Sequence, residues 1–349
     1  MPIDRLNALL DEAARTRGLD WRQCYRAVIV EPPGGRRVRV ECSDAAVLAA
    51  ARQAHRARPD DPEVTFVALP DAGADLAAPM VAASSVADVR REPAHASELL
   101  SQIVYGDAVT PLKDEGEWVL ARLDDGYVGW IRTWHLVRRS AGELADFLAR
   151  SRQRVALNHA EALEAPDPDA LPVSDLVIGT RLVTRGCGKR GWRAVELPDG
   201  KTGFVRSRAL EPVPRRRSPR REGLAATGLR FLGVPYIWGG TTPKGFDCSG
   251  LIQRIFRLHG VLLPRDSDQQ AGFGRLVEGG LDAMETGHLL FFGKEAITHV
   301  GMALPDGLFL HAHGQVKVGS LDLRHRLFEP DLRRIWRLTR DPLAAAGGP

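Results

Sequence analysis

The 349-residue sequence predicts a multidomain α+β protein, with a small N-terminal α/β unit, two small all-β barrels and a larger C-terminal α+β domain. Three observations carry this prediction. The chain is too long for one small core. A pattern of glycine, tryptophan and Asp-Gly turns occurs twice in its middle part. Further on, a run with helical periodicity begins at a cysteine and is followed by two apolar segments that read as a hairpin.

Residues 1–83 read as an α/β unit of order αββαβ. Helical periodicity, a hairpin around Pro-Pro-Gly-Gly and a final strand follow in this order: 5–15, 25–30, 37–41, 44–57 and 63–69. No residue pattern in this unit points to an activity. We therefore interpret it as an interaction or packing module.

The repeated pattern marks two barrels, which we place at 84–140 and 173–213. Each copy has a glycine turn before a tryptophan (Trp118 and Trp192), then an Asp-Gly turn and a Gly-Trp or Gly-Phe strand that leads to a final leucine. Short alternating strands between such turns are typical of small β-barrels. The pattern resembles bacterial SH3-like domains.

Two linkers separate these domains. Residues 141–172 form a helical linker by composition, which Pro-Asp-Pro-Asp at 166–169 interrupts. Residues 214–222 form a basic linker rich in arginine, which reads as a solvated segment and could also attract acidic substrates. The net charge of only +4 argues against a dedicated nucleic-acid binder.

The cysteines and the apolar runs limit the class of protein further. Cys24, Cys42, Cys187 and Cys248 show no paired spacing, so neither a disulfide framework nor a zinc site is indicated, and we predict no metal or other cofactor. The sequence contains no run of eighteen apolar residues, so we predict no membrane span. The first residues lack a basic stretch followed by an apolar one, so we expect no signal peptide and a cytoplasmic protein. The sequence does not indicate an oligomeric state.

Cys248 stands where a nucleophile would be useful. It follows a glycine-rich turn and lies in the first turn of a predicted helix, in which residues 251–258 have apolar side chains at helical spacing and which stops at Gly260. The unpaired N–H groups and the positive end of the dipole at a helix start favour a thiolate, which is the nucleophilic form of cysteine. An isolated cysteine in such a place is also consistent with a small buried packing residue.

Two histidines downstream are candidates for the base that a cysteine nucleophile needs. The segments 297–304 and 308–314 flank Pro-Asp-Gly and read as a hairpin. Counting back from this turn puts His299 and His311 opposite or diagonal to each other, within side-chain reach. His313 points the same way as His311 and is the competing candidate for a third catalytic residue.

These residues belong to an ordered series of motifs. The series is Pro235–Gly240, Phe246–Gly250, Leu263–Ser267, Gly287–Phe292, His299–Gly301 and His311–Ala312. It resembles the motifs of the NlpC-type cell-wall peptidases, a circularly permuted branch of the papain-like cysteine peptidases, over residues 223–341.

The resemblance implies a papain-like α+β fold and a role for each matching residue. Cys248 would be the nucleophile, His299 the general base and acid, and His311 the residue that orients His299. Tyr236 would stand beside the thiolate. His288 departs from the pattern, because the family usually has the aspartate of a Pro-Gly-Asp turn there.

With its tandem barrels, the chain resembles more narrowly the γ-D-glutamyl-diamino-acid peptidases of the dipeptidyl-peptidase VI type. Those enzymes cut peptidoglycan stem peptides (muropeptides) that have a free N-terminal L-Ala. The resemblance implies that Asp266, assisted by Glu98 and Tyr127, contacts the substrate amine. Asp247 and Ser249 flank the nucleophile and would line the site, although either could simply cap the helix start.

Two alternatives stay open at this point. The first is an amidase or acyltransferase of the same superfold, which would not require a free amine on its substrate. The second is a non-catalytic protein whose barrels bind wall peptides; the complete set of Cys248, His299 and His311 argues against it.

Overall fold

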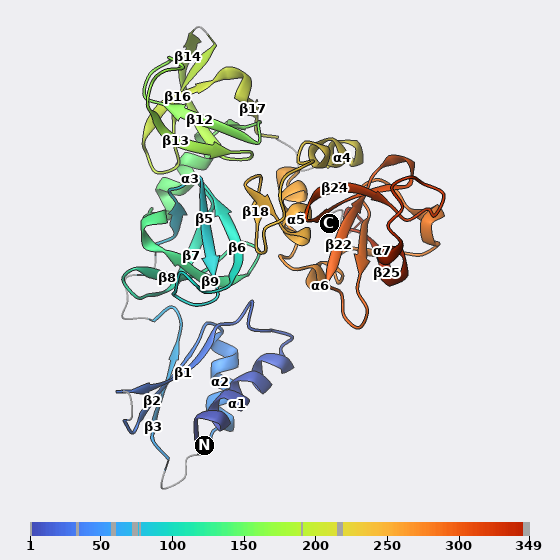
Figure 1. The fold of residues 1–349 in the computed structure, drawn as a ribbon. Coiled ribbons are helices and arrows are strands. Elements are labelled where there is room, and N and C mark those ends of the chain that lie inside the picture. Colours follow the sequence, from blue (N-terminus) through green and yellow to red (C-terminus); the bar gives the residue numbers. More distant parts are fainter. Residues whose placement is uncertain are drawn as a thin grey trace. The chain divides into compact units, whose positions relative to one another are not determined.

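The computed structural model describes residues 2–32, 35–56, 61–71, 76, 78–189, 191–214 and 219–344 (Figure 1). Contacts within the chain divide it into two compact units. The first unit comprises 1–81, 91–97 and 108–142, and the second comprises 82–90, 98–107 and 143–349. The division runs through the range predicted as the first barrel.

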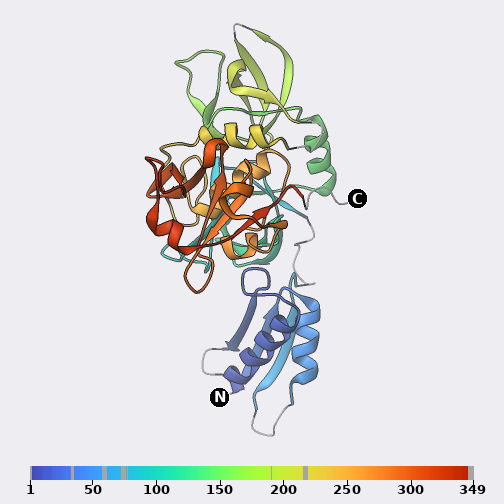
Figure 2. The ribbon, with the colours of Figure 1, turned by 90° about the vertical axis from the view of Figure 1, so that its right-hand side faces the viewer.

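The first unit opens with an αββαβ arrangement, as the sequence predicts. Its elements are α1 (Pro2–Thr16), β1 (Arg26–Glu31), β2 (Arg37–Cys42), α2 (Ala45–Ala54) and β3 (Glu63–Ala68). β2 is the central strand, antiparallel to β1 and parallel to β3. Both helices cover one face of this sheet (Figures 1 and 2), and the apolar faces of helices and sheet together form its core.

Two cysteines meet in that core. The Sγ atoms of Cys24 and Cys42 lie 3.5 Å apart, and both side chains are fully buried as free thiols. Sequence spacing gave no sign of this proximity, because eighteen residues and a hairpin separate the two cysteines. The side chain of Cys187 lies outside the described residues.

The rest of the first unit consists of antiparallel strands. They are β4 (Met80–Ala82), β7 (Ala108–Asp114), β8 (Trp118–Arg122), β9 (Val128–Arg132) and β10 (Leu136–Arg138), with a 3-10 turn η1 (Thr133–His135). β7, β8 and β9 pair in sequence order. Trp118 and Trp130 are buried in their core together with Leu69 and, at its edge, Tyr25, so the α/β arrangement and these strands share apolar contacts.

The second unit begins with the antiparallel pair β5 (Val86–Arg90) and β6 (Leu99–Val104). Helix α3 (Ala141–Arg150) follows. A seven-stranded sheet of order β13-β12-β16-β15-β14-β11-β17 comes next. Its strands are β11 (Gln153–Val155), β12 (His159–Leu163), β13 (Pro172–Val177), β14 (Arg181–Lys189), β15 (Trp192–Glu196), β16 (Thr202–Arg206) and β17 (Leu210–Pro212), with η2 (Ser207–Ala209) before the last.

This sheet starts earlier than the range 173–213 that the sequence predicts. β11 and β12 fall within the predicted helical linker, whose helix is confined to α3. β12 reads His-Ala-Glu-Ala-Leu, a composition that favours a helix, but it pairs with β13 and β16. Tertiary pairing therefore overrides local propensity here. In the predicted basic linker 214–222, residues 215–218 lie outside the described residues.

The C-terminal domain, also in the second unit, packs helices against a six-stranded sheet of order β20-β25-β21-β22-β23-β24. Its helices are α4 (Arg221–Leu229), α5 (Cys248–Leu258), α6 (Ser267–Gln270) and α7 (Pro330–Ile335), with turns η3 (Gly280–Ala283) and η4 (Pro305–Gly307). Its strands are β18 (Thr241–Thr242), β19 (Gly245–Phe246), β20 (Arg275–Val277), β21 (Leu289–Phe292), β22 (His299–Ala303), β23 (Leu308–His313), β24 (Gln315–Ser320) and β25 (Trp336–Asp341).

Helix α5 is buried along nearly its whole length and contacts β22 and β23. Its residues Leu251, Ile252, Ile255 and Phe256 have no exposed surface. At about 1.5–3 kcal/mol for each fully buried side chain, this burial fixes the helix against the sheet. The start of α5 is thereby held next to the strands that carry the histidines.

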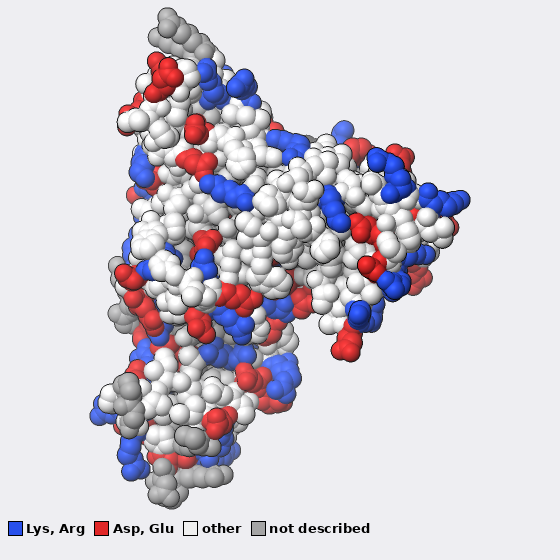
Figure 3. All heavy atoms as spheres, viewed as in Figure 1, with Lys and Arg blue, Asp and Glu red and all other residues white. Residues whose placement is uncertain are grey.

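Among the described residues, no helix is both long enough and apolar enough to cross a membrane. On the face that Figure 3 shows, lysine and arginine side chains are interspersed with aspartate and glutamate. This distribution agrees with the small net charge of the sequence.

Candidate active site

Cys248 is the first residue of α5, and Asp247 caps the helix. An Oδ1 of Asp247 accepts a hydrogen bond from the N–H of Gly250 at 2.7 Å, and its Oδ2 accepts one from the N–H of Gly239 at 2.9 Å. A carboxylate at this position satisfies N–H groups that the helix leaves unpaired. Asp247 thus ties the glycine-rich turn to the helix start and fixes the backbone of Cys248.

The thiol of Cys248 is neutral in the resting site. Burial, and then the carboxylate of Asp247, raise its pKa to about 12, although N–H groups of Val300 and Ser249 and the charge of Arg265 lower it. The expectation that the helix start favours a thiolate is therefore wrong for the resting site. The side chain is only 7% exposed, and the loss of hydration outweighs the N–H groups around the sulfur.

His299 and His311 form a hydrogen-bonded pair. His299 Nε2 and His311 Nδ1 lie 2.9 Å apart, across the antiparallel strands β22 and β23. His313 is exposed, and its ring centre is 6.4 Å from that of His299. The diagonal arrangement expected from the hairpin is present, and it brings His299 together with His311 rather than with His313.

Burial also keeps both imidazoles neutral. It lowers the pKa of His299 to about 4 and that of His311 to about 2, with the neighbouring histidines and Lys317 acting in the same direction. A neutral imidazole can accept the proton of a neutral thiol when the sulfur attacks. Both shifts favour an uncharged acid and an uncharged base in the resting site over an ion pair.

Glu329 lies near this pair without a hydrogen bond to His311, and the sequence gave no sign of it. Its Oε1 lies 3.8 Å from His311 Nε2 and 2.8 Å from the ammonium of Lys317. We assign the proton of His311 to Nε2, facing this carboxylate. His311 Nδ1 then accepts from His299 Nε2–H, which leaves His299 Nδ1 free of a proton and able to act as the base.

This protonation state predicts how Cys248 reacts with iodoacetamide. Because the thiol pKa is raised, the thiolate fraction and the alkylation rate should rise continuously between about pH 6 and pH 9. Inactivation rates measured across this range, with the modified residue identified by mass spectrometry, check it. A rate that is already constant below about pH 6 would indicate a preformed thiolate–imidazolium pair and contradict the assignment.

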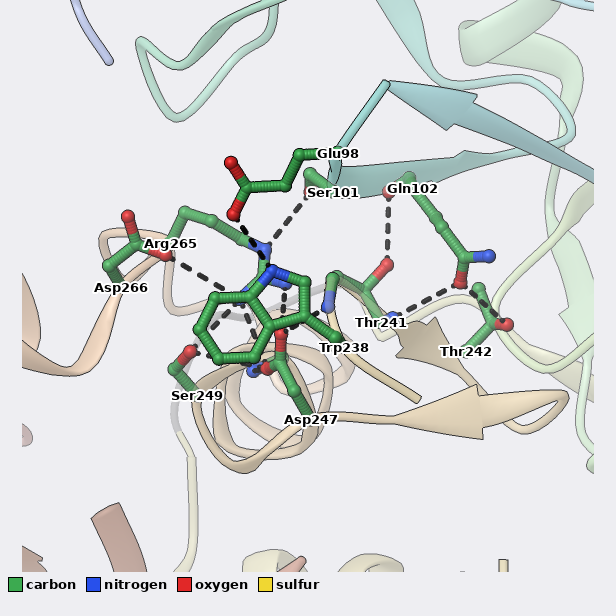
Figure 4. Close-up of polar contacts among 12 residues, drawn as sticks. Glu98, Ser101, Gln102, Trp238, Thr241, Thr242, Asp247, Ser249, Arg265 and Asp266 are labelled. Carbon is green, nitrogen blue, oxygen red and sulfur yellow. Dashed lines mark hydrogen bonds and ion pairs between the residues drawn. The ribbon is translucent and has the colours of Figure 1, made fainter. Parts of the chain in front are cut away.

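A buried arginine, Arg265, bonds both residues that flank Cys248 in the sequence (Figure 4). Arg265 is 1% exposed, and its Nη2 donates to Asp247 Oδ2 at 2.5 Å. Its Nη1 donates to Ser249 Oγ at 2.9 Å, and its Nε donates to Ser101 Oγ at 3.2 Å. Asp247 and Ser249, predicted to line the site, are thus part of a buried network around one guanidinium.

The residues predicted to contact the substrate amine fall in different places. Glu98 is exposed, and its Oε1 accepts a hydrogen bond from the indole of Trp238 at 3.0 Å. Asp266 precedes α6, with its Oδ1 3.9 Å from Arg265 Nη1. Both lie in the second unit with Cys248. Tyr127 lies in the first unit, 4% exposed and edge-on to Trp21, so its role stays a prediction.

Tyr236 and His288 differ in their relation to the nucleophile. Burial raises the pKa of Tyr236 to about 12, and the nearby Cys248 and Asp247 contribute, as expected for a phenol beside the reacting sulfur. His288 is buried elsewhere in the domain. Its Nδ1 accepts from the N–H of Glu285 at 3.1 Å, so it holds the turn before β21.

Comparisons with known proteins identify two families that match parts of this chain. Residues 233–337 match the NlpC/P60 family, and residues 89–136 match the bacterial dipeptidyl-peptidase SH3 domain. The first range contains Cys248, His299 and His311, and the second contains Glu98 and Tyr127.

Two curated relatives align over most of their length. A dipeptidyl-peptidase 6 from Lysinibacillus sphaericus is 30% identical, over 71% of this chain and 93% of the relative. A γ-D-glutamyl-L-lysine dipeptidyl-peptidase from Bacillus subtilis is 31% identical, over 68% of this chain and 80% of the relative. The crystal structure of an NlpC/P60 family protein from Bacillus cereus shares the fold, with a TM-score of 0.65 and 23% identity, over 76% of this chain and 99% of that one.

Proposed function

Because this chain belongs to the NlpC/P60 family of peptidases, we propose that it hydrolyses the bond between γ-D-Glu and the diamino acid in peptidoglycan stem peptides that have a free N-terminal L-Ala. The observation that supports a cysteine-peptidase mechanism is the hydrogen bond between His299 and His311. In the same domain, the N–H of Val300 contacts the thiol of Cys248. The names of the two relatives support the choice of bond.

The proposed reaction uses the neutral acid and base of the resting site. Cys248 Sγ attacks the γ-carbonyl carbon while His299 takes the thiol proton, and the backbone N–H of Cys248 stabilises the oxyanion. The C–N bond then breaks, and His299 returns the proton to the leaving amine of the diamino acid. Water, deprotonated by His299, hydrolyses the thioester and releases L-Ala-γ-D-Glu with regenerated thiol.

A free α-ammonium on the substrate requires anionic groups near its position. Glu98 and Asp266 supply two carboxylates (Figure 4). Glu98 accepts a hydrogen bond from Trp238, and Asp266 lies 3.9 Å from the guanidinium of Arg265. An ammonium ion removed from water without such partners would cost several kcal/mol. We therefore assign the amine end of the substrate to Glu98 and Asp266.

The requirement for a free amine also indicates which reaction must come before this one. L-Ala has a free amine only after another hydrolase has detached the peptide from the glycan strand. We propose that the enzyme acts in the cytoplasm on such released muropeptides, as part of the reuse of wall fragments. The basic residues of the linker 214–222 would favour association with these acidic peptides.

The test is product analysis by mass spectrometry with L-Ala-γ-D-Glu-diaminopimelate and its N-acetylated form. We expect cleavage of the free-amine peptide to L-Ala-γ-D-Glu and free diaminopimelate, with the acetylated peptide cut about 10- to 100-fold more slowly. Glu98→Gln and Asp266→Asn should each reduce this preference, because each removes a carboxylate that favours the ammonium. Glu161→Gln, at an exposed glutamate on β12, is the matched control.

Other outcomes separate the alternatives. Equal cleavage of both peptides would keep a peptidase but remove the amine site built from Glu98 and Asp266. Cleavage of neither peptide by folded protein would favour the amidase or acyltransferase. Binding of the peptide with no more turnover than a Cys248→Ala variant would favour the non-catalytic peptide-binding protein.

A further inference from the structure

Strand β6 lies along the glycine-rich turn that precedes Cys248 (Figure 4). At Gly239, a Cβ atom would be only 2.3 Å from the carbonyl oxygen of Leu99, and the φ of Gly239 is 76°. Only glycine permits this conformation at such a close approach. The start of β6 and the turn are therefore in direct backbone contact.

At the other end of this contact, Gln102 forms hydrogen bonds with Thr241 and Thr242. Its Oε1 accepts hydrogen bonds from Thr241 N–H and from Thr242 Oγ1, both at 3.2 Å. Its main-chain carbonyl accepts one from Thr241 Oγ1 at 3.0 Å. Three hydrogen bonds from two consecutive threonines thus converge on one residue of β6.

The amide of Gln102 is fixed in orientation by a fourth contact. Its Nε2 donates to Asp88 Oδ1 at 3.2 Å, and the other oxygen of Asp88 pairs with Arg90 at 2.7 Å. A rotated amide would point its NH₂ group at the Thr241 N–H and its oxygen at a carboxylate. The acceptor of Gln102 therefore faces the turn.

The register of β6 against the turn determines where Glu98 lies. Glu98 directly precedes β6 and accepts from Trp238, whereas Gln102 receives Thr241 and Thr242, so residues 98–102 run alongside residues 238–242. A slip of one residue would move Glu98 away from Trp238 and onto the other face of the strand.

We propose that Gln102 is a positioning residue, which fixes β6 against the turn 238–242 so that the carboxylate of Glu98 stays beside Trp238. The consequence for catalysis rests on the proposed function, in which Glu98 receives the substrate amine. Gln102 acts through Thr241 and Thr242 and does not itself contact substrate.

The first measurement does not depend on substrate. The indole N–H resonance of Trp238, assigned by its absence in Trp238→Phe, reports the hydrogen bond to Glu98. In Gln102→Ala of the full chain, this resonance should move to the position that it has in Glu98→Ala, which has no side-chain oxygen to accept the indole N–H. Gln153→Ala, at a partly buried glutamine on strand β11 of the same unit, should leave it in place.

The second measurement is kinetic. Gln102→Ala should raise KM for the free-amine peptide about tenfold. It should also reduce the ratio of kcat/KM for the free-amine peptide to kcat/KM for the acetylated peptide. We expect kcat to stay within about twofold, and the alkylation rate of Cys248 to be unchanged, because the triad is untouched.

An exchange of hydrogen-bonding groups tests the geometry directly. In the double variant Gln102→Glu with Asp88→Asn, the carboxylate at position 102 can accept hydrogen bonds from both threonines. The amide at position 88 can donate its N–H to that carboxylate, and its oxygen can still accept from Arg90. Both the indole resonance and KM should return toward their original values. Gln102→Glu alone, which opposes two carboxylates, should not restore them.

The proposal is overturned if the indole resonance stays in place in Gln102→Ala. It is also overturned if kcat and the alkylation rate fall together while the preference for the free amine persists, because Gln102 would then act on the nucleophile. If the unaltered enzyme cuts both peptides equally, the amine site fails instead, and the indole resonance alone decides whether Gln102 positions Glu98.

Discussion

Replacement of Cys248 by alanine is expected to lower kcat on the free-amine peptide by roughly four orders of magnitude, because no other nucleophile replaces the lost thiol. The change is small in volume at a site that is 7% exposed, so the fold should persist. Steady-state kinetics, together with circular dichroism and calorimetric binding of the peptide, check both parts.

Cys248→Ser is the matched variant. It keeps a group of similar shape, and the helix start, the cap from Asp247 and the hydrogen-bonded histidines all remain. Its hydroxyl is a far weaker nucleophile than a thiol, so kcat should stay low. If either variant retains activity within about tenfold of the unaltered enzyme, the nucleophile is another residue.

Replacement of Arg265 by methionine should strongly lower the free energy of unfolding. Arg265 and Asp247 form a buried pair, with side chains 1% and 10% exposed, and the methionine would leave the carboxylate without its charged partner. Breaking one partner of a buried pair costs about 3–5 kcal/mol of unfolding free energy. Urea denaturation followed by circular dichroism measures this loss.

Two further variants isolate the cause. Arg265→Met combined with Asp247→Asn removes both charges and keeps an oxygen to cap α5, so part of the lost stability should return. Arg275→Met, at an arginine whose side chain is 72% exposed, should change the free energy of unfolding by less than about 0.5 kcal/mol. Equal losses in Arg265→Met and in the double variant would show that packing, and not the unpaired carboxylate, determines the effect.

The features that the sequence could predict are local ones. The motif around Cys248 combines a turn, a cap and a helical pattern within a few residues, and the hairpin that joins His299 and His311 follows from counting back from Pro-Asp-Gly. The repeated turns likewise predicted β-barrels. In each case the signal lies within about fifteen residues of the chain.

The features that it could not predict depend on contacts between distant segments. Ser101 meets Arg265 across 164 positions, and Gln102 meets Thr241 across 139. Glu329 reaches His311 only after the chain has passed through β24. The neutral state of Cys248 was also missed, because the sequence shows a helix start but not how far packing excludes water.

The protonated state of the buried Cys248 thiol also bears on oxidative damage. Peroxides attack thiolates, and a thiol that is both protonated and shielded from solvent reacts slowly with them. We therefore expect Cys248 to react slowly with hydrogen peroxide in the absence of substrate. In the proposed reaction, the thiolate that peroxides attack forms when His299 takes the proton.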